Sequence, residues 1–122
     1  MVLINHKDIS DDSIESIEKI EDIKKTNPNS CLRFDFSEKN LELIRYCQAN
    51  DLAFALNIES IKEVILSNSF DAKYIITNDR ELVIKAQKIA DNYMFDLKVL
   101  FESDNEDDIE YLALNEIDGV VF

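Results

Sequence analysis

Short apolar runs alternate with amphipathic segments along the whole chain. The runs at Lys73–Thr77 and Leu97–Phe101 are almost continuously apolar, as in strands that are covered on both faces of a parallel sheet. The segments between the runs carry apolar residues at helical spacing. Each strand–helix–strand step takes about 20 residues, which is enough for a right-handed crossover between parallel strands. The pattern therefore predicts an α/β protein.

The pattern also places the individual elements. The predicted strands are Val2–Asn5, Cys31–Phe36, Leu52–Leu56, Lys73–Thr77, Leu97–Phe101 and Gly119–Phe122. The predicted helices are Ser10–Lys25, Glu38–Ala49, Glu59–Ser67, Arg80–Asn92 and Glu106–Asn115. In the first of these helices, isoleucines recur at every third position from Ile14 to Ile23 and form one stripe.

These elements predict a single α/β domain over residues 1–122. Its architecture is expected to be three-layered, with a mostly parallel sheet of five or six strands and helices on both faces, like flavodoxin and receiver domains. A partial (β/α) barrel is the alternative. The runs at Cys31–Phe36, Leu52–Leu56, Lys73–Thr77 and Leu97–Phe101 are predicted to be inner strands. The apolar strand Gly119–Phe122 is expected at an edge, where a partner would cover it, which predicts a symmetric homodimer.

The net charge of the chain limits the classes of molecule that it is expected to bind. There are 26 acidic against 13 basic residues, a formal net charge of −13. Nucleic acids and anionic membranes would be repelled at long range, so we expect protein partners and neither of these. No apolar run approaches the roughly 20 residues of a membrane span. The two cysteines, Cys31 and Cys47, lie on an apolar strand and an apolar helix face, which indicates buried, inert thiols and a cytoplasmic location.

Glycine is almost absent. Gly119 is the one glycine, and it lies outside every predicted strand-to-helix loop. Phosphate-binding loops need glycines to bring backbone N–H groups against the anion, so no nucleotide cofactor is expected. Without glycine, Asn50, Asn68 and Asn92 are predicted to take the left-handed conformation at helix ends.

In a parallel sheet, ligands bind beyond the carboxyl ends of the strands. Four carboxylates follow the predicted strands there, namely Asp35, Glu59, Asp79 and Glu102. If they converge, they would hold Mg²⁺ or Mn²⁺, because hard cations prefer oxygen ligands. The alternative is helix capping, with Asn78 and Glu81 at the spacing of a capping box.

Histidine occurs once, as His6, directly after the first predicted strand. A histidine there could act as a general base near neutral pH. The sequence places no serine or cysteine beside it.

Three resemblances add to these expectations. The segment Tyr74–Leu82 resembles the late strand-and-loop motif of PIN-domain nucleases, which implies that Asp79 is a metal ligand; where that family has an aspartate after strand one, this chain has Asn5 and His6. The β/α alternation is similar to that of phosphoreceiver domains, with Thr77 at the switch hydroxyl and Asn57 in the acceptor region. The segment from Ser60 to Phe122 looks like a small bacterial α/β family of unassigned function.

The expected function is that of a non-enzymatic protein-interaction or regulatory module. The alternative is a divalent-metal-dependent hydrolase, like the PIN-domain nucleases, that uses the four strand-end carboxylates.

Overall fold

The computed structural model describes residues 1–9 and 12–122. The strands are β1 (Val2–Ile4), β2 (Ile14–Ser16), β3 (Cys31–Asp35), β4 (Phe54–Asn57), β5 (Tyr74–Thr77), β6 (Lys98–Glu102) and β7 (Gly119–Val121). The α-helices are α1 (Leu41–Ala49), α2 (Ile61–Ser69), α3 (Arg80–Asn92) and α4 (Asp108–Leu114). Two short 3₁₀ helices, η1 (Ile20–Lys25) and η2 (Glu38–Asn40), complete the described elements.

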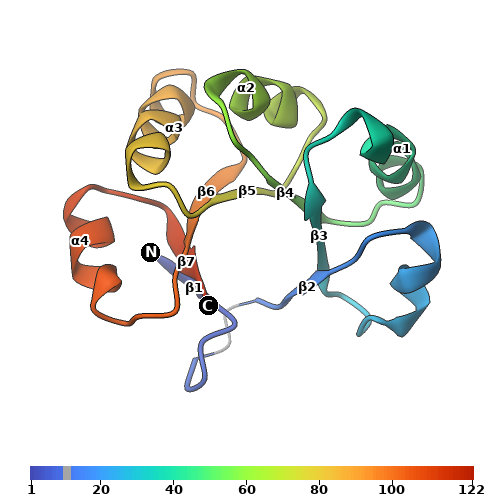
Figure 1. Cartoon of the computed structure of the whole chain (residues 1–122), viewed down its shortest axis with the longest axis horizontal. Helices are drawn as coiled ribbons and strands as arrows, with labels where there is room; N and C mark the ends of the chain where they lie inside the picture. The colour runs from blue at the N-terminus through green and yellow to red at the C-terminus, as the bar shows by residue number, and fades with distance from the viewer. Residues whose placement is uncertain (10–11) are drawn as a thin grey trace.

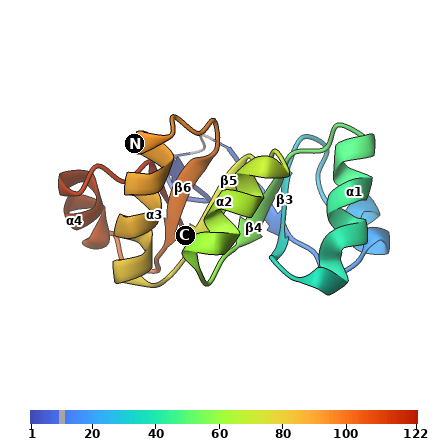
Figure 2. The same ribbon diagram turned by 90° about the horizontal axis from the view of Figure 1, so that it is seen from above.

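All strand pairs described are parallel, in the order β1-β7-β6-β5-β4-β3-β2. The sheet curls into an incomplete ring, and the helices lie on its outer, convex side (Figure 1). Seen at right angles, α4, α3, α2 and α1 follow one another from left to right, with the strands behind them (Figure 2). The predicted α/β class with a parallel sheet is confirmed, and so is the inner position of β3, β4, β5 and β6. Of the two architectures left open, the structure matches the partial (β/α) barrel. The sheet has seven strands instead of five or six, and none of the described helices lies on its concave side.

Both faces of the sheet are apolar. The concave face carries a cluster to which every strand contributes, comprising Ile4, Ile14, Cys31, Ala55, Tyr74, Ile76, Leu100 and Val121. The opposite side chains of the same strands, such as Val99 and Leu56, pack in two further clusters with the helices. This explains the continuous apolar runs in the sequence, because a strand buried on both faces needs apolar residues at every position.

The side chain of Asn5 joins the two ends of the curled sheet. Its Nδ2 donates to the carbonyl oxygen of Ile14 at 3.1 Å, and its Oδ1 accepts from the Ile14 N–H at 3.2 Å. Asn5 directly follows β1, whereas Ile14 begins β2, and these strands stand at opposite ends of the strand order. The amide therefore takes the place of a neighbouring backbone and holds the barrel seam together.

The helix predicted over Ser10–Lys25 is wrong in its described part. Ile14–Ser16 forms a strand paired with β3, and only Ile20–Lys25 is helical, as a 3₁₀ helix. Ile14 points into the concave cluster, whereas Ile17 packs under the helices. The spacing of three matches the three residues per turn of a 3₁₀ helix in its second half. Ser10 and Asp11 lie outside the described residues.

The predicted edge position of the last strand is also wrong. Strand β7 pairs with β6 on one side and with β1 on the other. Gly119 occupies a place where this packing is closest: a Cβ atom there would lie 2.6 Å from the carbonyl oxygen of Val2 and 2.7 Å from Cδ2 of Leu100. The one glycine of the chain is thus required by close strand packing.

Helix ends also differ from the prediction. The left-handed residues near them are Asp51, Asp71, Met94 and Glu116, and none of the three predicted asparagines. Asn50 acts instead through its side chain, whose Nδ2 donates to the carbonyl oxygen of Tyr46 at 2.8 Å. In the described residues, no helix has the length and apolarity that crossing a membrane would need.

Candidate functional site

Polar side chains gather at the mouth of the barrel, where the carboxyl ends of its parallel strands meet. Side chains alternate between the two faces of a strand, so Arg33 and Asp35 follow Cys31 on the concave face of β3. Asn57 at the end of β4 pairs in register with Asp35, and Ser16 on β2 pairs with Arg33. The mouth is thus built from neighbouring strands whose inner side chains change from apolar to polar at this level.

Arg33 organises the mouth. Its Nε donates to Oδ1 of Asn57 at 2.7 Å, and its Nη2 forms an ion pair with Oε2 of Glu102 at 2.7 Å. The side chain of Arg33 is only 15% exposed, so most of it is removed from water. Glu102 ends β6, which is three strands away from β3 in the sheet. Arg33 therefore crosses the concave side and links two distant strands.

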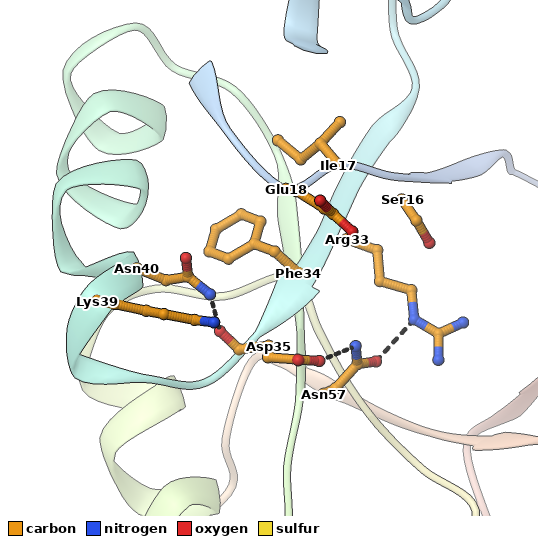
Figure 3. A pocket seen from close by; sticks show the side chains of 9 residues that line it. All are labelled: Ser16, Ile17, Glu18, Arg33, Phe34, Asp35, Lys39, Asn40 and Asn57. Carbon is orange, nitrogen blue, oxygen red and sulfur yellow. Dashed lines mark hydrogen bonds between the residues drawn. The ribbon is translucent and has the colours of Figure 1, made fainter. Parts of the chain in front are cut away.

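Asn57 connects Arg33 to Asp35. With its Oδ1 turned to Arg33, its Nδ2 donates to Oδ1 of Asp35 at 2.7 Å (Figure 3). The amide has one donor end and one acceptor end, and each end has a partner of the opposite kind. The chain of contacts fixes a positive group and a negative group on either side of one amide.

A pocket of about 530 Å³ opens beside this chain of contacts. Besides the three residues above, Lys39 and Asn40 reach it from η2, and Asn40 Nδ2 donates to the carbonyl oxygen of Asp35 at 2.8 Å. The lining residues are Ser16, Ile17, Glu18, Arg33, Phe34, Asp35, Lys39, Asn40 and Asn57 (Figure 3). The volume lies in the range of small-molecule sites, which are concave and carry a few fixed polar groups.

The four predicted metal ligands have different surroundings. Asp79 caps α3, with its Oδ1 accepting from the N–H groups of Glu81 and Leu82 at 2.9 and 3.0 Å. The capping-box spacing had indicated Asn78 as the cap of α3, but the capping residue is Asp79. Asp35 and Glu102 belong to the Arg33 network, whereas the N–H of Glu59 is bound by the carboxylate of Glu63. Within the described part of the chain, no three of these four carboxylates lie together as a group of metal ligands.

A second group of residues of the kinds that bind metal ions lies at the other side of the mouth. One nitrogen or oxygen atom each from His6, Asp8 and Glu106 lies within 4.8 Å of the others. His6 Nδ1 accepts from the N–H of Asp8 at 3.1 Å, so the neutral ring carries its proton on Nε2, which contacts Glu106. A cation on Nε2 would require that proton to move to Nδ1 and the bond from Asp8 to break. The ring also meets Phe122 edge to face, with centroids 5.2 Å apart, and the arrangement suits a hydrogen-bonded histidine better than a metal ligand.

The opposite end of the barrel holds a separate polar cluster. Asp12 accepts from Lys73 Nζ at 2.8 Å and from the Tyr74 hydroxyl at 3.0 Å. Burial raises the pKa of Asp12, but the hydrogen bonds from Lys73, Ser13 and Tyr74 outweigh it and hold that pKa below its usual value. Burial, followed by the hydrogen bond to Asp12, raises the pKa of Tyr74 to about 12. These contacts tie the segment before β2 to β5, which is a structural role.

Sequence reasoning found Asp35, Asn57 and Glu102 as strand-end residues but missed Arg33 and Lys39. Arg33 had a signal: it is a charged residue between the apolar Leu32 and Phe34 in the middle of a strand, two positions before Asp35 and thus on the same face. Lys39 had none, because its place in the pocket depends on how η2 follows β3. Compared with known proteins, the sequence matches no protein-family model and no curated protein.

Proposed function

We propose that this chain is a non-enzymatic regulatory module that binds a small polar molecule in the mouth pocket. The observation that carries the proposal is the contact chain Glu102–Arg33–Asn57–Asp35 beside a pocket of about 530 Å³. An arginine whose side chain is only 15% exposed and whose donors are held in place is a prepared recognition group, because little ordering is left to be done when the ligand arrives. Its two contacts use two of the five N–H donors of a guanidinium, which leaves others for a ligand.

The partners of the acidic groups support binding over catalysis. A general acid or base must reach the reacting atom of a substrate. The carboxylate of Asp79 is used by the α3 cap, and Glu102 is ion-paired with Arg33. His6 is paired with Glu106, outside the residues that line the mouth pocket. Because these side chains already have partners within the protein, the arrangement favours ligand binding over acid–base catalysis.

A thermal-shift screen tests the proposal. Pools of small polar molecules, namely amino acids, sugars, sugar phosphates and carboxylic acids, are added at millimolar concentration, and at least one pool should raise the melting temperature. Asn57→Ala removes both contacts of the central amide and should abolish the shift. Asn115→Ala is the matched control, because it removes a side-chain hydrogen bond to the carbonyl oxygen of Tyr111 at the end of α4. The proposal fails if no pool shifts the protein, or if both variants reduce the shift equally.

We also propose that the chain forms a symmetric homodimer in the cytoplasm, although the edge position of the last strand no longer supports it. Three large apolar side chains on or after α3 and α4 are strongly exposed and support an interface: Tyr93 (69%), Met94 (85%) and Leu114 (77%). Free, buried Cys31 and Cys47 fit a reducing compartment. Light scattering at tens of micromolar tests the dimer, and a monomeric mass would contradict it.

A further inference from the structure

We infer that the molecule bound in the mouth pocket is a small zwitterion of the α-amino acid type, with its carboxylate on Arg33 and its ammonium group on Asp35. This inference rests on the proposed function and specifies its ligand class. It follows from three features of the pocket, which are its balance of charge, the spacing of its fixed charges, and the field of the protein around it.

The lining of the pocket is balanced in charge. Arg33 and Lys39 contribute two positive charges, and Glu18 and Asp35 contribute two negative charges. The whole chain, by contrast, has twice as many acidic as basic residues. A pocket for a phosphate ester would be expected to have an excess of positive charge, and a pocket for a metal ion an excess of carboxylates. A balanced lining is complementary to a ligand that carries one charge of each sign.

Fixed positions separate the charges. Asn57 stands between Arg33 and Asp35 and bonds to each of them at 2.7 Å, so the guanidinium and the carboxylate are held one amide apart. In an α-amino acid the carboxylate and the ammonium group are also close neighbours, since both are attached to one carbon. Arg33 offers the planar donor fork that suits a carboxylate. Asp35 has a second carboxylate oxygen beyond the Oδ1 that accepts from Asn57, and this oxygen suits an ammonium donor.

The electrostatic field of the whole protein disfavours ligands that carry a net negative charge. With a net charge of −13, the protein repels a phosphate ester of charge about −2 before it reaches the pocket. A zwitterion has no net charge and is not repelled.

Isothermal titration calorimetry of the full chain tests the inference, with the twenty amino acids as probes and three groups of analogues. N-acetyl amino acids lack the ammonium charge, amino acid methyl esters lack the carboxylate, and sugar phosphates carry only negative charge. At least one free amino acid should bind, and its acetylated and esterified forms should bind at least about tenfold more weakly, because a charge-assisted hydrogen bond contributes about that factor or more.

Two variants assign the ends of the ligand. Arg33→Gln should weaken the binding of the free amino acid far more than that of its methyl ester. Asp35→Asn should weaken the binding of the free amino acid far more than that of its N-acetyl form. Arg80→Gln and Asp71→Asn are the controls; the first breaks a surface ion pair with Asp108 at 2.5 Å, and neither residue lines the pocket. If Arg33→Gln does not fold, Arg33→Lys keeps the charge without the fork and should still weaken carboxylate binding.

The outcomes separate this inference from the proposed function. Binding of a sugar phosphate or a simple carboxylate without any amino acid would overturn the inference and leave the binding module in place. Equal loss with the pocket variants and the controls would overturn it as well. Absence of binding by every probe in both the calorimetric and the thermal-shift experiments would overturn both.

Discussion

The barrel seam depends on one asparagine, and its removal should have a large effect. Asn5→Ala deletes the two hydrogen bonds between its amide and the backbone of Ile14, a residue that is 6% exposed. Two such bonds contribute about 2 kcal/mol in total. Asn5 also has a φ of 58°, in the left-handed region, where alanine costs about 1 kcal/mol more than asparagine. The free energy of unfolding should therefore fall by about 3 kcal/mol, out of a total of about 5–15 kcal/mol for a domain of this kind.

Urea unfolding followed by circular dichroism measures this loss, and two further variants separate its parts. Asn5→Gly removes the amide but accepts the left-handed backbone, so it should cost about 2 kcal/mol. Asn29→Ala places alanine at a φ of 73°, where the described residues show no hydrogen bond to the asparagine side chain, and should cost about 1 kcal/mol. If Asn5→Ala costs no more than Asn29→Ala, the amide does not hold the seam and the argument is refuted.

Four further results follow from packing, burial and titration. Gly119→Ala forces a Cβ to within 2.6 Å of a backbone oxygen and should lower the free energy of unfolding by about 1–3 kcal/mol in the same urea assay. Ser67→Ala should raise the melting temperature, because among the described residues the fully buried Oγ has no hydrogen-bond partner; a lower melting temperature would show an unseen partner. Since hydrogen bonds lower the pKa of Asp12 in the folded protein, the stability it contributes is present above its unfolded pKa of about 3.9 and is lost as the pH falls through the folded value. Asp12→Asn should therefore flatten the decline of the melting temperature in acid, and an unchanged decline would contradict this. Burial raises the pKa of Cys31 to about 12 and that of Cys47 to about 11, so neither thiol of the folded protein should react with a disulfide reagent at pH 8, whereas both should react after unfolding.

The sequence by itself determined the class of fold and most of its elements. Continuous apolar runs at β5 and β6 already require cover on both faces, and this condition leads to a parallel sheet with connecting helices. The helix Arg80–Asn92 has the predicted bounds, because its apolar face and its acidic first turn are local features. The inner position of the four central strands follows from the same apolar character.

Local pattern failed where one spacing fits two structures. Isoleucines at every third position fit a helix stripe, but they also allow Ile14 to enter the concave core from a strand while Ile20 and Ile23 pack from a 3₁₀ helix. The choice was made by pairing with β3, which is a contact between distant segments. The order of the strands is likewise a property of the whole sheet, which no single apolar run encodes. In this order the last strand lies between β1 and β6 and not at an edge.

In the candidate site, too, some features could be predicted from the sequence and others depended on the tertiary structure. Asp35, Asn57 and Glu102 could be placed at strand ends from the sequence, since the carboxyl ends of parallel strands meet at one edge. Capping by Asp79 is a local contact with Glu81 and Leu82, and the sequence already offered helix capping as an alternative for these carboxylates. Only the tertiary structure decided that Asp35 and Glu102 belong to the network of Arg33, because those contacts depend on distances across the barrel. Strand position is a property of the local sequence, but the contact between β3 and β6 through Arg33 exists only once the sheet has curled.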